Sequence, residues 1–257
     1  MWKIIRISVL LLVLAGVVAN TWLDRVSTTS WENTLWVGIF PMSADGSTVA
    51  NSYVSGLTAE DFASIETFFA EQTAQYGLKI DRPVRVELYP VQHELPPALP
   101  RNANVFQTMW WSLKIRLFAR SAAKVPGRAP SHIRIFVLYH DPEVNETVPH
   151  SLGLQKGLVG VVHAYASRQM AGANNIVIAH EALHTVGATD KYDIRSGVPH
   201  YPSGYGEPDR QPRFPQRFAE IMAGQRALSA TAQEMPQSLR AVLVGPETAR
   251  EIGWTRK

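Results

Sequence analysis

The chain of 257 residues contains no cysteine and almost no excess of charge. Without cysteine there are no disulfide bridges, no thiolate zinc ligands and no cysteine nucleophile. Lysine and arginine together number 25 against 22 acidic residues, and two of the excess positive charges lie at Lys3 and Arg6. A nearly neutral body has no general attraction to phosphate, so we expect no nucleic acid as a partner.

Long hydrophobic runs are absent except at the N-terminus, where an uncharged one extends from Ile7 to Ala19. This run follows the positive charges of Lys3 and Arg6. A charged start followed by an apolar stretch is typical of a secretory signal, and we therefore expect export of the chain. The hydrophobic residues of the whole chain, at 46%, are enough for one good-sized core.

The N-terminal segment fits either a signal peptide or a membrane anchor. Val17 and Ala19 form an acceptable cleavage site, and cleavage after Ala19 would give a secreted or periplasmic protein. Trp2 and Trp22 lie about 30 Å apart on a helix, which is the thickness of the hydrocarbon core of a bilayer. A tryptophan near each interface favours an uncleaved transmembrane anchor at residues 1–23, with the body outside the membrane.

Beyond the anchor, strand-like and helix-like patterns alternate along the chain. Apolar or alternating runs predict strands at residues 34–42, 84–91, 132–139 and 157–166. Helical spacing of apolar residues predicts helices at residues 58–76 and 104–123. Strands separated by helices predict an α/β fold with a mixed, mostly parallel sheet.

The helix expected at residues 104–123 combines an apolar stripe with several basic residues. The stripe consists of Phe106, Met109, Trp110, Leu113 and Leu117, and the basic residues are Lys114, Arg116, Arg120 and Lys124. We predict that the stripe covers the sheet and that the charges form the exposed face. The alternative is a helix that lies on a membrane surface.

The most informative motif comprises His180, Glu181 and His184. Two histidines four positions apart lie on one face of a helix and can hold one metal ion. In a His-Glu-x-x-His motif the histidines bind zinc and the glutamate acts as general base toward water. Asn175 as a cap and the residues after it predict a zinc helix at residues 175–187.

Gly187 and Asp190 extend this motif. A glycine three residues after His184 permits the left-handed turn that ends a helix and reverses the chain. The reversed chain would return Asp190 toward the metal, which gives three ligands and an open position, as in a catalytic zinc site. If Asp190 is not the third ligand, the competing residues are Asp193, His200 and Glu207.

The pattern His-Glu-x-x-His-x-x-Gly-x-x-Asp resembles the long motif of the metzincin clan of zinc metallopeptidases. Asp190 stands where most members have a third histidine, and an aspartate there is similar to the snapalysin-type variant of the clan. The resemblance implies an upper subdomain, here residues 24–187, that contains an antiparallel edge strand and the zinc helix. It implies a smaller lower subdomain, here residues 188–257, which begins with a proline- and glycine-rich loop.

The resemblance also implies residues around the metal. Metzincins have a methionine turn beneath the metal, for which Met222 is the candidate. Some members have a tyrosine just after this turn that assists the oxyanion, but none follows Met222 here, and the candidates are Tyr192, Tyr201 and Tyr205. Asp193 is a candidate for orienting a ligand imidazole, or it has a simple turn role.

These features predict an extracytoplasmic, membrane-anchored zinc endopeptidase with Glu181 as general base and a peptide or protein as substrate. The strand at residues 157–166 is expected to be the cleft edge that pairs with an extended peptide. Two alternatives remain open: a zinc hydrolase of non-peptide amides, such as cell-wall components, and a metzincin-like binding protein without catalysis. The intact Glu181 argues against the second alternative.

Overall fold

The computed structural model describes residues 28–100, 102–128 and 130–255, together with residues 2, 6, 7 and 11. The anchor expected at residues 1–23 therefore lies almost entirely outside the described residues. Within the described part of the chain, no helix combines the length and the apolar sequence that a bilayer crossing requires.

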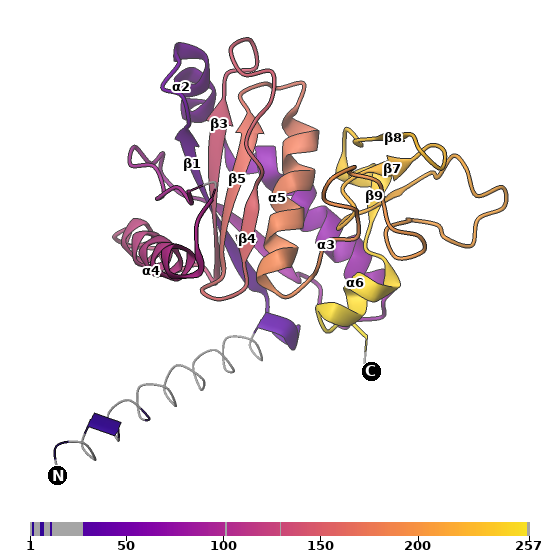
Figure 1. Ribbon diagram of the computed structural model, residues 1–257, viewed down its shortest axis with the longest axis horizontal. Helices are drawn as coiled ribbons and strands as arrows, with labels where there is room; N and C mark the ends of the chain where they lie inside the picture. The colour runs from indigo at the N-terminus through magenta and orange to yellow at the C-terminus, as the bar shows by residue number, and fades with distance from the viewer. Residues whose placement is uncertain are drawn as a thin grey trace.

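A five-stranded sheet forms the centre of the molecule (Figure 1). Its strand order is β2 (Val84–Leu88), β1 (Leu35–Ser43), β3 (Ile133–His140), β5 (Val159–Tyr165) and β4 (Leu152–Leu154). The first four strands are parallel, and β4 pairs antiparallel with β5. Strands β1 and β3 are buried along almost their whole length, as is usual when helices cover both faces of a parallel sheet. The predicted α/β fold with a mixed, mostly parallel sheet is confirmed.

Helices cover both faces of this sheet (Figure 1). Helices α3 (Ala63–Gln75) and α5 (Ala171–Thr185) pack on one face and share the larger core with it, and α4 (Val105–Ala122) packs on the other. The 3-10 helix η1 (Ala59–Phe62) precedes α3, and a capping box between Thr58 and Asp61 begins it. The sequence patterns missed α2 (Thr48–Ser55), which is capped by Ser47.

The C-terminal part consists of short elements packed beside α5 and α3 (Figure 1). They are β6 (Ala219–Glu220), β7 (Arg226–Ala227), β8 (Gln233–Glu234), η2 (Leu239–Ala241), β9 (Val242–Leu243) and α6 (Pro246–Glu251). Strand β6 pairs with β9, and β7 pairs with β8. Buried residues of this part, such as Ile221, Val244 and Ile252, belong to the same core as α5. The lower part of the chain is therefore packed onto the upper part through a common core.

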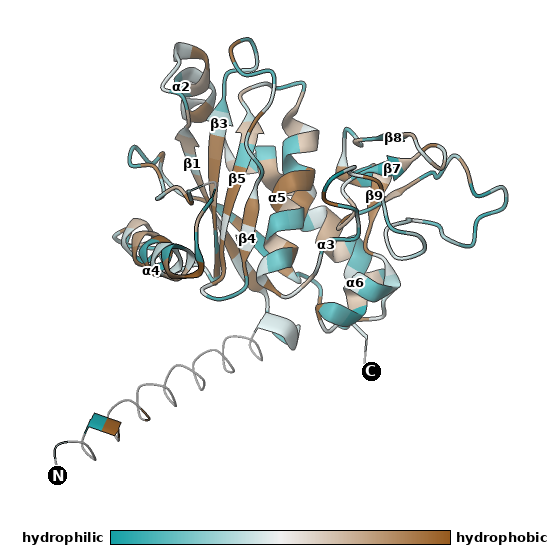
Figure 2. Cartoon of the chain, viewed as in Figure 1, coloured by the Kyte–Doolittle hydropathy of each residue, from teal (hydrophilic) through white to brown (hydrophobic). Residues whose placement is uncertain are grey.

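The prediction about the buried face of α4 is wrong. Helix α4 covers the sheet, but it does so through Trp111, Ile115 and Ala119. The stripe that we expected to be buried is 42% to 82% exposed at Phe106, Met109, Trp110, Leu113 and Leu117. The helix has two apolar faces, and helical spacing alone does not tell which of them meets the sheet. Figure 2 shows hydrophobic and hydrophilic residues side by side on α4, whereas the strands are mostly hydrophobic.

Two further expectations need correction. Strand β5 is not the edge of the sheet, because Val159–Val161 pair with the three residues of β4. The edge of the sheet beside α5 is therefore β4. Helix α5 begins at Ala171, four residues before the expected start, so Asn175 lies inside the helix and is not its cap. The Asn175 side chain instead donates hydrogen bonds to the Asp61 carbonyl and to Ser64 Oγ of the neighbouring segment.

Candidate metal centre

The side chains of His180, His184 and Asp190 converge at the C-terminal end of α5. Asp190 Oδ1 lies 3.3 Å from His180 Nε2 and 3.1 Å from His184 Nε2. One potential ligand atom of each residue lies within 4.8 Å of the others. This group could hold a metal ion. Of the described residues, no other group of three or more histidines and acidic residues meets this criterion.

A turn at Gly187 brings Asp190 back to the helix. Gly187 has a φ of 110°, which side chains other than hydrogen rarely allow. The amide of Ala188 donates to the carbonyl of Leu183 over 3.1 Å, which closes the end of α5. The sequence predicted this reversal from the position of the glycine alone.

Backbone carbonyls fix the two imidazole rings. His180 Nδ1 lies 2.9 Å from the carbonyl oxygen of Ile221, and His184 Nδ1 lies 2.9 Å from that of Ala188. A carbonyl only accepts, so each Nδ1 carries a proton. In the neutral ring Nε2 then has a lone pair for a metal ion, whereas in the protonated ring Nε2 donates to Asp190. Both Nε2 atoms face Asp190, which is the arrangement that shared coordination of one cation needs. Backbone partners have no sequence signature, and sequence reasoning missed them.

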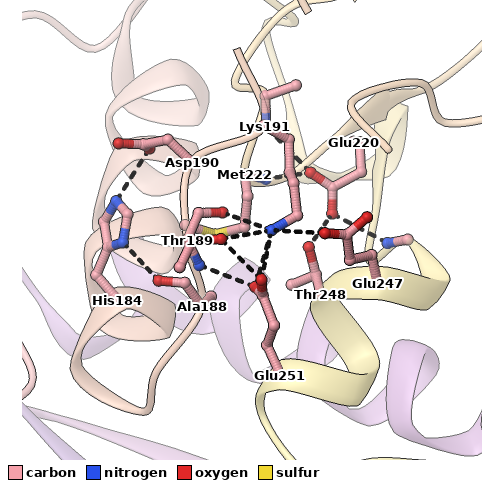
Figure 3. A network of polar contacts seen from close by, with 12 residues as sticks. His184, Ala188, Thr189, Asp190, Lys191, Glu220, Met222, Glu247, Thr248 and Glu251 are labelled. Atoms are coloured by element: carbon pink, nitrogen blue, oxygen red, sulfur yellow. Dashed lines mark hydrogen bonds and ion pairs between the residues drawn. The ribbon is translucent and has the colours of Figure 1, made fainter. Parts of the chain in front are cut away.

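The turn that contains Met222 is held by the buried carboxylate of Glu220 (Figure 3). Oε2 of Glu220 accepts from the amides of Met222 and Ala223, at 2.6 and 3.0 Å. Oε1 accepts from the Gly245 amide at 3.1 Å and from Thr248 Oγ1 at 2.7 Å. This carboxylate holds the turn from which the Ile221 carbonyl meets His180, and Met222 itself is fully buried.

A second network holds the loop that carries Asp190 (Figure 3). The ammonium of Lys191, whose side chain is only 3% exposed, lies 2.8 and 2.9 Å from the two carboxylate oxygens of Glu251 on α6. The same carboxylate accepts from the amide and the hydroxyl of Thr189. The Lys191 amide donates to the carbonyl of Met222. Residues on both sides of Asp190 are thus tied to the C-terminal part of the chain.

Glu181 lies in the same region and is only 4% exposed. Its Oε2 atom is buried and has no hydrogen-bond partner among the described residues. Burial raises the pKa of the Glu181 carboxyl, while the neighbouring His180 and His184 act to lower it. An unpaired buried carboxylate oxygen is costly to the fold, so a purely structural role does not account for it.

The edge strand β4 runs directly over this end of α5. A Cβ atom on Gly153 would lie 2.5 Å from His184 Cβ and 2.7 Å from the Glu181 carbonyl oxygen. Only glycine permits this close approach. The outer edge of the sheet is therefore adjacent to the metal group.

The ionised carboxylate of Asp190 also favours a cation at this site. Burial acts to raise the pKa of Asp190, but hydrogen bonds from His180 and His184 outweigh it, and the pKa lies well below its usual range. The carboxylate is thus strongly stabilised as an anion by positive or donating neighbours. A metal ion bound by the same three residues would fill that role.

The other candidate residues have different surroundings. Tyr192 lies close enough to Asp190 and Glu181 that their charges, in addition to burial, raise its pKa. Tyr201 and Tyr205 instead pack against each other. Asp193 Oδ1 accepts from the amides of residues 195 and 196, so it caps its own turn, and both Nδ1 atoms of the metal histidines already have carbonyl partners. Among the competing third ligands, Glu207 pairs with Arg217.

No protein-family profile matches the chain, and no curated protein is similar to it in sequence.

Proposed function

We propose that the protein is a zinc-dependent endopeptidase. The observation that carries the proposal is the buried, unpaired Oε2 of Glu181 beside a group of two histidines and one aspartate. A structural metal site needs no such oxygen. A hydrolytic site needs a general base next to the metal, in a position where it can take a proton from water.

The donor atoms fit zinc. Two neutral imidazole nitrogens and one carboxylate oxygen are common ligands of zinc, and three protein ligands with one open position are typical of its catalytic sites. The imidazole protons are also placed correctly for metal binding, because the carbonyls of Ile221 and Ala188 hold them on Nδ1 and leave Nε2 for the ion. Zinc in such a site would polarise a substrate carbonyl and acidify water to a pKa of about 7.

The residues of the chain then have separate tasks. His180, His184 and Asp190 hold the ion, and the Glu181 carboxylate accepts the proton of the attacking water and passes it to the leaving amine. The low exposure of Glu181 keeps bulk water away from this proton. Of the candidate tyrosines, we assign to Tyr192 the hydrogen bond to the oxygen of the attacked carbonyl, which is supported by the effect of Asp190 and Glu181 on its pKa.

The position of β4 supports an extended peptide as the substrate. Among the described strands, β4 has a neighbour only on its β5 side, so its outer backbone groups can pair with a peptide. The approach of Gly153 to His184 means that such a peptide would lie next to the metal group. In this proposal residues 1–23 anchor the enzyme, with the catalytic body on the extracytoplasmic side.

The test compares Glu181→Gln with the unaltered chain and with Glu71→Gln, which changes an exposed glutamate of α3. Zinc content and the cleavage of a peptide library are measured for all three proteins. We expect about one zinc per chain in each, and a loss of roughly 100-fold or more in cleavage for Glu181→Gln alone, because only this variant lacks the base. Retention of full cleavage by metal-loaded Glu181→Gln would refute the mechanism, and absence of zinc from all three would refute the function.

A parallel assay with cell-wall fragments tests the closest alternative. Release of amines from these fragments, without cleavage of any peptide in the library, would assign the same site to non-peptide amides. The edge strand β4 favours peptides because it offers backbone hydrogen bonds to an extended main chain.

A further inference from the structure

Among the labelled helices, α4 has the largest number of exposed large hydrophobic residues. Its stripe of exposed apolar residues, here called the α4 stripe, consists of Phe106 (82% exposed), Met109 (64%), Trp110 (60%), Leu113 (42%) and Leu117 (57%). These five residues recur at helical spacing on the side opposite Trp111, Ile115 and Ala119, which meet the sheet. A contiguous apolar face of this kind marks an interaction surface.

The charged residues of α4 all have one sign. Helix α4 contains no acidic residue. Lys114 and Arg120 on the helix and Lys124 just after it are exposed. The ammonium of Lys114 lies 5.8 Å from the ring centre of Trp110, so positive charge directly borders the apolar stripe.

We propose that the α4 stripe and its flanking cations bind the surface of an anionic lipid bilayer. Apolar and aromatic side chains on one helical face enter the boundary between headgroups and acyl chains, and lysine and arginine beside them meet anionic headgroups. The proposal concerns α4 alone and does not depend on a metal or on catalysis.

A second copy of the chain is a poorer occupant of this face. A two-fold interface would bring α4 against α4, since such interfaces use the same patch on both subunits. Lys114 and Arg120 would then approach their own copies with no acidic residue on either helix to compensate them. Like charges in one interface disfavour association, whereas a layer of anionic headgroups complements them.

The length of the N-terminal segment is consistent with this arrangement. Eight residues separate Ala19, the end of the apolar run, from Thr28, where the continuously described chain begins. A chain of that length spans at most about 30 Å, so an anchored body stays close to the bilayer. In Figure 1 α4 lies on one side of the central sheet, and the C-terminal strands β7, β8 and β9 lie on the other side.

The absence of cysteine makes a direct test possible, because a single introduced thiol is the only one in the chain. Leu113→Cys in the full chain is labelled with a nitroxide, and the protein is reconstituted into vesicles with or without about one third anionic lipid. Val49→Cys is the matched control: Val49 is 43% exposed on α2, a helix with no charged residue. Immersion in lipid raises collisions of the label with oxygen and lowers collisions with a water-soluble nickel complex.

We expect the label at position 113 to become immersed in anionic vesicles only, and the label at position 49 to stay in water. Lys114→Glu combined with Arg120→Glu should lower the ratio of immersed to free label about 30-fold or more, because two attractions of about 1 kcal/mol each are lost. The control variant combines Arg195→Glu and Arg240→Glu, which change exposed arginines far from α4 in the sequence, and it should leave the ratio of immersed to free label unchanged.

Three results would overturn the proposal. The first is a label at position 113 that stays accessible to nickel in anionic vesicles. The second is equal immersion in neutral and anionic vesicles together with no response to the charge reversal. The third is spin–spin coupling between labels at position 113 that does not depend on lipid, which would assign the face to a second copy.

Discussion

The contact between Lys191 and Glu251 makes a sharp prediction about how the metal centre is held. Lys191→Met removes the ammonium and keeps most of the side-chain volume. Removal of one partner of a fully buried ion pair costs about 3–5 kcal/mol. The Glu251 side chain is 20% exposed and keeps two hydrogen bonds from Thr189. We therefore expect a loss of about 2–3 kcal/mol in the free energy of unfolding.

The same substitution should weaken metal binding. Lys191 follows Asp190 directly, and its side chain ties the Asp190 loop to α6. Substitution of groups that hold a metal ligand in place typically lowers metal affinity about 10- to 100-fold. The assays are urea unfolding of the metal-free full chain in a mild detergent, and competition for zinc with a coloured chelator. Lys79→Met, at an exposed lysine, is the control.

A double variant separates the ion pair from the packing. Lys191→Met with Glu251→Leu removes both charges, and a buried pair replaced by apolar groups often costs little. We expect the double variant to lose less stability than the sum of the two single variants. If Lys191→Met lowers stability by less than about 1 kcal/mol and leaves zinc affinity unchanged, the ion pair does not hold the centre and this reasoning fails.

Three more predictions concern the surroundings of the centre. Asp190→Ala should lower zinc affinity by more than about 100-fold, whereas Asp190→His should restore part of it; unchanged affinity in a chelator titration of Asp190→Ala would assign the third ligand elsewhere. Gly153→Ala should cost about 1–3 kcal/mol in urea unfolding, because its Cβ would lie 2.5 Å from His184 Cβ, while Gly56→Ala, with 3.5 Å of space, should cost less. Burial and the neighbouring His140 lower the pKa of His163 to about 4. Below pH 6.5 the unfolded chain therefore binds a proton at this histidine that the folded chain does not bind. The thermal stability of the metal-free protein should fall from pH 6.5 to 4, and it should fall less in His163→Gln.

The helix that carries His180 and His184 was predictable because its signals are local. The spacing of His180 and His184, the glycine three residues later and Asp190 all lie within eleven residues of the sequence. The alternation of strands and helices likewise gave the fold class, since each pattern depends on the period of one element. The start of α5 was misplaced by four residues because Asn175 is polar and near the helix start, but its side chain serves a contact with Ser64 instead.

The contacts that hold the centre come from distant parts of the chain. Ile221 reaches His180 across 41 residues, and Glu251 reaches Lys191 across 60. The edge strand β4 has only three residues, which is too few for a periodic pattern. The prediction for α4 was wrong for another reason. Its helical period was identified correctly, but the helix has two apolar faces, and the one richer in aromatic residues is exposed instead of packed on the sheet.

Two buried glutamates, which the sequence does not distinguish, differ in the structure in how many hydrogen bonds their oxygens accept. Glu220 and Glu181 are both almost fully buried, and burial raises the pKa of each. Glu220 has both oxygens occupied, by three backbone amides and the Thr248 hydroxyl, so its carboxylate holds a turn. Glu181 leaves Oε2 without a partner beside three potential metal ligands. A carboxylate that serves only the fold is expected to be saturated in this way, and therefore the unsaturated one is the group that we assign to chemistry.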